Sequence, residues 1–174
     1  MSLVFQYGSN TLVERLNSSE RLNGGAKVVG TAYTFEKFDL DFTVWSRSNH
    51  CAAADIVPQG SMHIWGVLYE IPDNLIYRQL SGARKSLDAI EGEGGNYQRK
   101  DIQVILSNDK SSIISVLTYV VRERRSELKT SSAYASEILK GLKTHNMPKN
   151  YLRYVYGQIL KNNSDIQEEI PSII

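Results

Sequence analysis

Strand-like segments dominate the first 122 residues of this 174-residue chain, and short turns join most of them. β-Branched and aromatic residues are concentrated in residues 26–35, 39–46, 62–71, 96–106 and 112–122. A parallel, doubly wound sheet would need a helix between successive strands, and that alternation is absent. The sequence therefore predicts an α+β fold, in which a small mixed or antiparallel sheet, either open or closed into a β-barrel, has flanking helices.

Helical periodicity appears at the start, in the middle and at the end of the chain. Apolar residues at helical spacing predict a short helix over residues 11–16 and longer helices over residues 132–146 and from Pro148 onwards. Two further short helices are expected on either side of a break at Ser81-Gly82-Ala83. These helices are expected to pack around the sheet.

The segment of residues 47–61 is polar, contains Pro58 and Gly60, and is predicted to be a loop. Residues 1–161 are expected to form one domain. Residues 162–174 are expected to form a C-terminal tail that either docks on this domain or frays.

Composition narrows the classes of protein that this chain can belong to. Apolar residues make up 41% and charged residues 22%, as in ordinary globular proteins, and the net charge of +1 gives no reason to expect nucleic acid or an anionic membrane as a partner. One cysteine excludes an internal disulfide, and the three histidines are too far apart in sequence for a recognisable metal motif. No segment is long and apolar enough for a membrane span or a signal peptide, so a cytoplasmic location is expected.

The stretch Val4-Phe5-Gln6-Tyr7-Gly8-Ser9-Asn10 is the first candidate for a binding site. Val4 and Phe5 suit a buried strand, Gly8 permits a sharp change of direction, and the next two residues are both helix-capping types. A strand that passes through such a turn into a helix presents free backbone N–H groups, which bind carboxylate or phosphate. The alternative is an ordinary strand–turn–helix joint with no ligand.

Glu91 is the second candidate. It follows the apolar residues Leu87 and Ile90 and precedes a run of glycines, so the end of a short helix could hold its carboxyl group at a cavity. Apolar surroundings disfavour ionisation of a carboxyl group, which suits a general base working near neutral pH. The alternative is a surface residue at a helix end, which is the reading we give to the neighbouring Glu93.

Several motifs in this order resemble the γ-glutamylcyclotransferase-like family, which includes the AIG2-like proteins. They are Tyr7-Gly8-Ser9-Asn10, then Gly66 within a strand, then Leu87-Asp88-Ala89-Ile90-Glu91-Gly92 followed by Tyr97, and finally Ser132-Ala133-Tyr134. The similarity runs from about Val4 to about Val155. The tail lies beyond it, and residues 50–61 do not match the family pattern clearly.

This resemblance implies a fold, a reaction and a set of site residues. The fold is a small β-barrel with flanking helices, and the reaction cyclises a γ-glutamyl group to 5-oxoproline with release of an amine or amino acid. Glu91 is the implied general acid/base, Val4 to Asn10 line the substrate pocket, and Tyr134 contacts the substrate. The resemblance implies a small-molecule γ-glutamyl substrate and no metal or organic cofactor, and it leaves open whether the chain forms a homodimer.

Two other functions are compatible with the sequence. One is a non-catalytic module of the same fold that binds a small anion. The other is a different acyl transfer with Ser9 or Cys51 as the nucleophile, although no histidine lies at a spacing that suggests a base for Ser9. The sequence leaves the natural leaving group of the γ-glutamyl substrate open.

Overall fold

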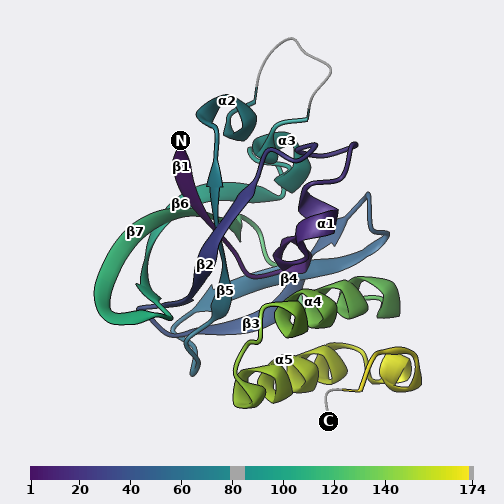
Figure 1. The fold of residues 1–174 in the computed structure, drawn as a ribbon. Coiled ribbons are helices and arrows are strands. Elements are labelled where there is room, and N and C mark those ends of the chain that lie inside the picture. Colours follow the sequence, from purple (N-terminus) through teal and green to yellow (C-terminus); the bar gives the residue numbers. More distant parts are fainter. Residues whose placement is uncertain (79–84, 173–174) are drawn as a thin grey trace.

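The computed structural model of this protein describes residues 1–78 and 85–172. Seven strands, five α-helices and two 3₁₀-helices occur among these residues (Figure 1). The predicted break at Ser81-Gly82-Ala83 lies outside the described residues. None of the helices that the structure describes is long and apolar enough to cross a membrane.

Five of the strands form a closed barrel in the order β1-β5-β2-β6-β7. Their bounds are β1 Ser2–Gln6, β2 Lys27–Thr34, β5 Trp65–Ile71, β6 Tyr97–Leu106 and β7 Asp109–Val121. All the pairings are antiparallel except that of β1 with β7, which is parallel and closes the barrel. The predicted α+β fold with a mixed β-barrel is confirmed.

The other two strands, β3 (Phe38–Ser46) and β4 (Cys51–Pro58), pair with each other as a separate antiparallel hairpin. The prediction of a loop over residues 47–61 was therefore wrong, because only the turn before β4 and the segment after it are irregular. The run Ala52-Ala53-Ala54-Asp55 has low strand propensity. Its residues are all buried, however, so tertiary packing rather than local preference determines the strand.

Hydrogen bonds to its carboxylate explain how the charged residue Asp55 fits into the middle of β4. Asp55 has no exposed surface, and its carboxylate accepts hydrogen bonds from the backbone N–H of Val121, the Thr43 hydroxyl and the Arg124 guanidinium, at 2.5–3.1 Å. A buried charge is tolerated only when it is paired and hydrogen-bonded in this way. The contacts with Val121 and Arg124 attach the hairpin to the end of β7 and the segment that follows it.

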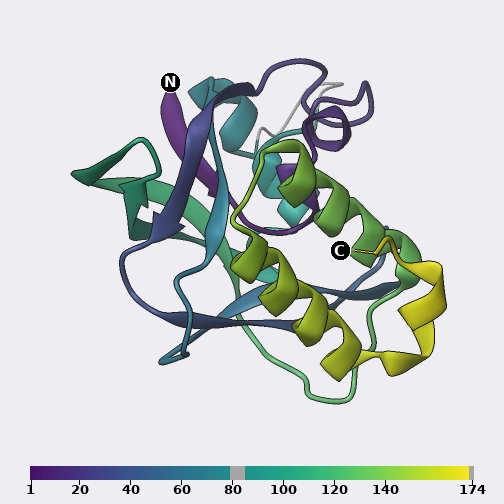
Figure 2. The ribbon, with the colours of Figure 1, turned by 60° about the horizontal axis from the view of Figure 1, so that its bottom comes forward.

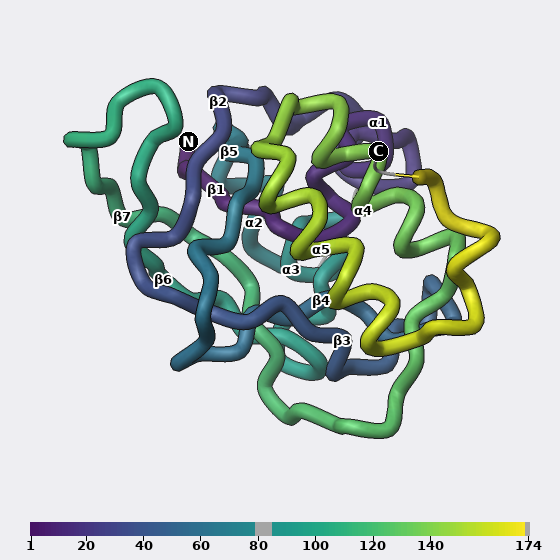
Figure 3. Tube along the Cα trace, turned by 90° about the horizontal axis from the view of Figure 1, so that it is seen from below, coloured from purple at the N-terminus to yellow at the C-terminus, as the bar shows by residue number. Residues whose placement is uncertain are grey.

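The helices lie on one side of the molecule and at one end of the barrel. The chain leaves β1 through η1 (Ser9–Thr11) and α1 (Val13–Leu16), and α2 (Asp73–Ile76) and α3 (Leu87–Glu91) follow β5. Figure 2 shows α4 (Ser132–Thr144) and α5 (Lys149–Asn162) side by side. In Figure 3 the tip of the β6–β7 hairpin projects on the side away from these two helices.

Close packing of α4 against η1 depends on one glycine. A Cβ atom at Gly141 would lie 2.3 Å from the Thr11 hydroxyl oxygen and 2.7 Å from the backbone nitrogen of Leu12. Any other residue at position 141 would push the two elements apart. Gly141 therefore sets the distance between α4 and η1, two elements that both contribute residues to the site described below.

The C-terminal segment packs against the domain as far as residue 172. After α5 it forms η2 (Ser164–Glu169), in which Ile166 is buried, and Ile170 is buried just beyond it. The Asn163 side-chain amide also donates a hydrogen bond to the Thr130 carbonyl at 2.8 Å. The predicted tail is thus docked over its described length.

Candidate active site

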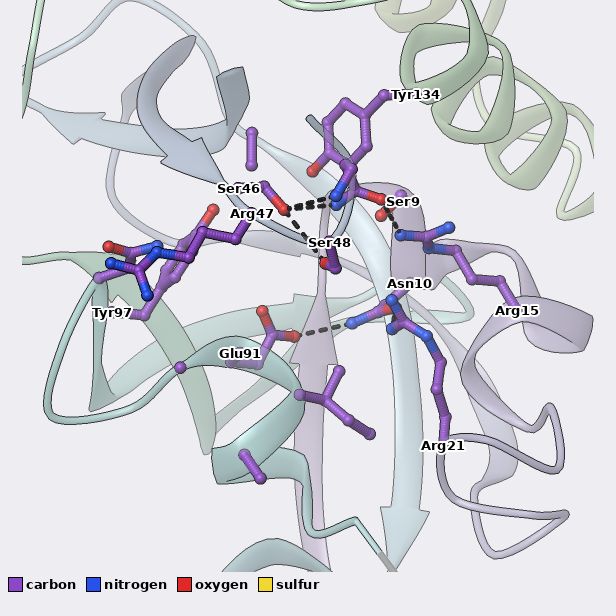
Figure 4. Close-up of a pocket in the computed structure, with 16 residues that line it drawn as sticks. Ser9, Asn10, Arg15, Arg21, Ser46, Arg47, Ser48, Glu91, Tyr97 and Tyr134 are labelled. Carbon is purple, nitrogen blue, oxygen red and sulfur yellow. Dashed lines mark hydrogen bonds between the residues drawn. The ribbon is translucent and has the colours of Figure 1, made fainter. Parts of the chain in front are cut away.

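Two adjoining cavities lie where β1 and α3 end and α4 begins (Figure 4). The outer pocket has a volume of about 310 Å³, and the inner chamber has a volume of about 30 Å³. Five residues line both cavities: Ser9, Asn10, Glu91, Tyr97 and Tyr134. The outer volume is at the lower end of the range for small-molecule sites, and the inner chamber has room for one small polar group.

The turn after β1 forms one wall of both cavities. The Thr11 backbone N–H and hydroxyl both donate to the carbonyl of Gly8, at 3.1 and 2.8 Å, and the Tyr69 hydroxyl donates to the carbonyl of Asn10 at 2.9 Å. Gly8 has a φ of −96° and a ψ of −145°. A Cβ atom there would come within 3.5 Å of the Tyr134 hydroxyl, so glycine leaves space in the chamber.

Helix α3 holds Glu91 at the opposite wall. The Ser86 hydroxyl accepts a hydrogen bond from the backbone N–H of Ala89 at the start of the helix, and Gly92 ends it in the left-handed conformation with a φ of 69°. Asp88 in the same helix is buried and accepts hydrogen bonds from the Tyr119 hydroxyl at 2.7 Å and the Arg78 backbone N–H at 3.0 Å. Caps at both ends and a buried anchor fix the position of the Glu91 carboxyl group.

Asn10 connects Glu91 to a guanidinium group. Its side-chain amide nitrogen donates to Glu91 Oε1 at 2.8 Å, and its amide oxygen accepts from Arg21 Nη1 at 2.8 Å. Burial raises the pKa of Glu91 above the usual value of 4.5, against the opposing effects of the Asn10 hydrogen bond and the positive charge of Arg21. Glu91 is therefore a carboxyl group with a pKa shifted towards neutrality and fixed at the junction of the two cavities.

Four tyrosines surround the inner chamber: Tyr7, Tyr97, Tyr119 and Tyr134. Tyr7 donates to the Tyr119 carbonyl and Tyr97 to the Ala54 carbonyl, both at 2.7 Å. The Tyr134 hydroxyl accepts a hydrogen bond from the backbone N–H of Ala54 at 3.1 Å, so its own proton is left to be donated elsewhere. Burial raises the pKa of all four phenols, so they remain neutral at physiological pH.

Three arginines line the outer pocket, and their surroundings differ. Arg15 forms an ion pair with Glu137 at 2.7 Å and hydrogen-bonds to Asn49, and Arg21 hydrogen-bonds to Asn10. Arg47 is exposed in the turn between β3 and β4, and it forms no hydrogen bond or ion pair with any residue in the described parts of the chain. Figure 4 shows Arg15 and Arg21 on one side of Glu91 and Arg47 on the other.

The structure brings most of the predicted site residues together. Seven of them line one or both cavities: Gln6, Tyr7, Gly8, Ser9, Asn10, Glu91 and Tyr134. Val4 and Phe5 line neither cavity, because both side chains point into the hydrophobic core and have no exposed surface. The two residues belong to strand β1, as their predicted strand character implied, and their side chains are part of the core rather than of the cavity walls.

The sequence did not reveal several other residues of the site. Arg15 and Arg21 come from α1 and the irregular segment after it, Arg47 from the turn between β3 and β4, and Tyr119 from near the end of β7. Tyr97, which lines both cavities, belongs to the motifs of the resemblance but was not predicted as a site residue. Three further residues of the same motifs line the outer pocket: Ala89, Ile90 and Gly92. The three arginines and Tyr119 have no local signal, because their place in the site depends on how distant elements pack.

No histidine among the described residues is paired with either alternative nucleophile. Cys51 is buried and lines neither cavity, and Ser9 lines both. His63 and His145 each lie within hydrogen-bonding distance of a backbone carbonyl, and no histidine in the described parts of the chain lines either cavity. Within the same residues, no three His, Cys, Asp or Glu side chains are grouped as they would be in a metal site.

Several solved structures have the same fold as this protein. A γ-glutamyl cyclotransferase is 24% identical with a TM-score of 0.75, over 89% of this chain and 86% of that one. An uncharacterised human protein is 26% identical with the same TM-score and coverage. YkqA from Bacillus subtilis is 22% identical with a TM-score of 0.72, and the match covers 91% of this chain and 54% of that longer one.

Comparison by sequence gives a more specific assignment. The comparison with curated proteins found no match to this sequence. The model of the AIG2-like family matches residues 63–155, which is 93 of the 174 residues and includes Glu91, Tyr97 and Tyr134. Because this match spans more than half of the sequence, the chain belongs to the AIG2-like family.

Proposed function

We propose that this protein is a γ-glutamylcyclotransferase, which converts the γ-glutamyl group of a small molecule to 5-oxoproline and releases an amine or amino acid. The observation that carries the proposal is the Glu91 carboxyl group. It has a raised pKa, is held by Asn10 at 2.8 Å, and lies where a small chamber meets a pocket of substrate size. The similarity to a γ-glutamyl cyclotransferase structure supports the fold that this reaction requires.

The proposed reaction needs one proton carrier. The α-ammonium group of the substrate loses a proton to Glu91, and the free amine attacks the γ-carbonyl carbon to close a five-membered ring. The C–N bond to the leaving group then breaks as Glu91 returns this proton to the departing nitrogen. The new ring nitrogen gives up its second proton, which solvent passes to the released amine. No water is consumed, and the ring nitrogen and leaving nitrogen exchange places on the carbonyl carbon.

The cavities supply the shape that cyclisation requires. The amine and the carbonyl carbon that react belong to the same flexible γ-glutamyl group. Binding that holds them close together therefore supplies in advance much of the entropy cost of ring closure. The inner chamber is only large enough for one small group, so we place the cyclising end of the substrate there and at Glu91, and the leaving group in the outer pocket.

Tyr134 and the turn after β1 are the groups that we assign to the developing oxyanion or the α-carboxylate. The Tyr134 hydroxyl has its lone pair engaged by Ala54, and burial raises the pKa of this phenol, so it can donate a hydrogen bond to a negative oxygen. Backbone N–H groups at the start of η1 provide additional donors. Neither role requires a nucleophile from the protein, so Ser9 is assigned to substrate binding.

A product assay with a binding assay tests the proposal. Wild-type protein incubated with γ-glutamyl-alanine should release 5-oxoproline and alanine in equal amounts, measured by mass spectrometry. Calorimetry with the same compound reports binding independently of turnover. Binding with no 5-oxoproline from a panel of γ-glutamyl amino acids, peptides and amines would contradict the proposal and support a binding module of the same fold.

A further inference from the structure

The charges that line the outer pocket do not balance. Four ionisable residues carry charge there: Arg15, Arg21, Arg47 and Glu91. The charge of Arg15 is matched by Glu137, which lies 2.7 Å away, and Arg21 is connected to Glu91 through Asn10. Arg47 has no acidic partner among the described residues, so one positive charge at the pocket faces outward without compensation.

Arg47 lies at the part of the pocket that the cyclising end does not reach. It belongs to the turn between β3 and β4, which also places Ser46, Ser48 and Asn49 on the pocket wall. Figure 4 shows it across Glu91 from Arg15 and Arg21. Since the attacked carbonyl must lie near Glu91, only the portion of the substrate beyond that carbonyl can extend to Arg47.

The γ-glutamyl group itself gives Arg47 nothing to neutralise. Its α-ammonium and α-carboxylate cancel, and this group is common to every substrate of the proposed reaction. Serine hydroxyls and asparagine amides, rather than an apolar surface, surround Arg47 on the turn. A long aliphatic amine would offer the guanidinium no negative charge to bind, and a cationic amine would be repelled by it.

From these contacts we propose that the leaving group carries a carboxylate and that Arg47 binds it, so that Arg47 is a specificity-determining residue for amino acid or peptide leaving groups over amines. This inference rests on the proposed function. An arginine presents parallel N–H donors that match a carboxylate, and such charge-assisted bonds are stronger than neutral ones. The exposed position of Arg47 gives the interaction a clear dependence on salt.

A matched pair of substrates isolates the proposed contact. γ-Glutamyl-alanine and its C-terminal amide differ only in the charge of the leaving group, and 5-oxoproline release gives kcat/KM for each. Wild-type protein should prefer the acid by about tenfold, the size expected for one charge-assisted hydrogen bond. The preference should fall towards one in Arg47→Gln, recover in part in Arg47→Lys, and decrease with added salt in the wild type.

Arg153→Gln is the control, because Arg153 is exposed on α5 and lines neither cavity. This substitution removes the same charge as Arg47→Gln. The acid-to-amide preference of the control should equal that of the wild type. If Arg47→Gln lowers kcat/KM for both substrates by the same factor, Arg47 binds the common γ-glutamyl group and the inference is wrong. If no γ-glutamyl compound yields 5-oxoproline, the proposed function is wrong and this inference fails with it.

Discussion

At the scale of single residues, the site depends on a carboxyl group whose ionisation is disfavoured by burial in the folded protein. Glu91 is placed against apolar and tyrosine surfaces and is only partly compensated by Asn10 and the nearby Arg21. A group in this state gives up and takes a proton near neutral pH more readily than an ordinary glutamate. The same placement should cost the protein stability, as the next prediction states.

We expect Glu91→Gln to be more stable than the wild type at neutral pH, and we expect the difference to depend on pH. The pKa of Glu91 is raised in the folded state, so its contribution to stability is fully present below the unfolded value of about 4.5 and is lost as the pH rises through the folded value. The glutamine side chain of the variant does not ionise, so the variant does not lose stability in this way. Its advantage in unfolding free energy should therefore be small near pH 4 and should grow as the pH rises through the folded-state pKa of Glu91.

Urea denaturation between pH 4 and pH 8 measures this difference. Glu168→Gln serves as the control, because Glu168 is exposed on η2 and far from the site in sequence. If the difference in unfolding free energy between Glu91→Gln and the wild type stays constant with pH, burial does not perturb the ionisation of Glu91.

How far the sequence predicts the site differs from residue to residue. Tyr7 to Asn10 and Glu91 are placed in one pocket by a resemblance that pairs two motifs some eighty residues apart. In the structure all of them line the cavities, and Asn10 hydrogen-bonds to Glu91. Arg21 and Tyr119 could not be predicted, because an arginine in a loop and a tyrosine in a strand are unremarkable locally. Only the pairing of distant elements gives such residues a common cavity.

At the scale of elements, β4 shows why one strand was not predicted. Three alanines and an aspartate carry no strand signal, and the segment is stabilised by pairing with β3 and by the contacts of Asp55 with Thr43 and Arg124. These contacts are tertiary and do not appear as a periodic pattern. The consequence for function is direct, since the turn before β4 carries Arg47 and the strand itself carries the Ala54 backbone that binds Tyr97 and Tyr134.

The packing of α4 on η1 gives a prediction at this scale. Gly141→Ala should destabilise the protein by about 1–3 kcal/mol, because the new methyl group would overlap backbone atoms of η1 that cannot rotate away. Activity should fall as well, because η1 contributes Ser9 and Asn10 and α4 contributes Tyr134 to the cavities.

Gly157→Ala is the matched control for this substitution. It changes the same residue type in the adjacent helix α5, and a Cβ atom there would have no neighbour within 4 Å. Helix propensity alone should make this variant about 0.5–1 kcal/mol more stable than the wild type. Thermal unfolding of both variants tests the account, and equal effects of the two would contradict the close contact at Gly141.

At the scale of the whole molecule, the barrel is what assembles the site. Closing β1 against both β5 and β7 brings the N-terminal turn next to α3 and α4, which are about eighty and more than a hundred residues later in the chain. The order of strand-like and helical segments predicted the α+β class, and the family resemblance implied that the sheet closes into a barrel. Both predictions were confirmed. The order of segments could not predict that β3 and β4 would separate from the barrel, because pairing partners are chosen by the packing of the complete chain.

The docked C-terminal segment gives a prediction for the whole chain. A protein that ends at residue 162 should lose about 3 kcal/mol of unfolding free energy, because the buried side chains of Ile166 and Ile170 are removed and apolar surface is uncovered. Chemical denaturation measures the change, with Gln167→Ala in the full chain as the control for an exposed residue of η2. A truncated protein as stable as the full chain would show that this segment contributes no packing energy.

The most direct test of the proposed mechanism is 5-oxoproline formation from γ-glutamyl-alanine by wild type, Glu91→Gln and Glu93→Gln. Glutamine at position 91 keeps the size of the side chain and removes the proton carrier, so the rate should fall roughly 10²–10⁴-fold while substrate binding by calorimetry persists. Glu93 lies two residues away and lines neither cavity, so its variant should keep the wild-type rate. Wild-type rates from Glu91→Gln would contradict the assignment of Glu91 as the general acid/base.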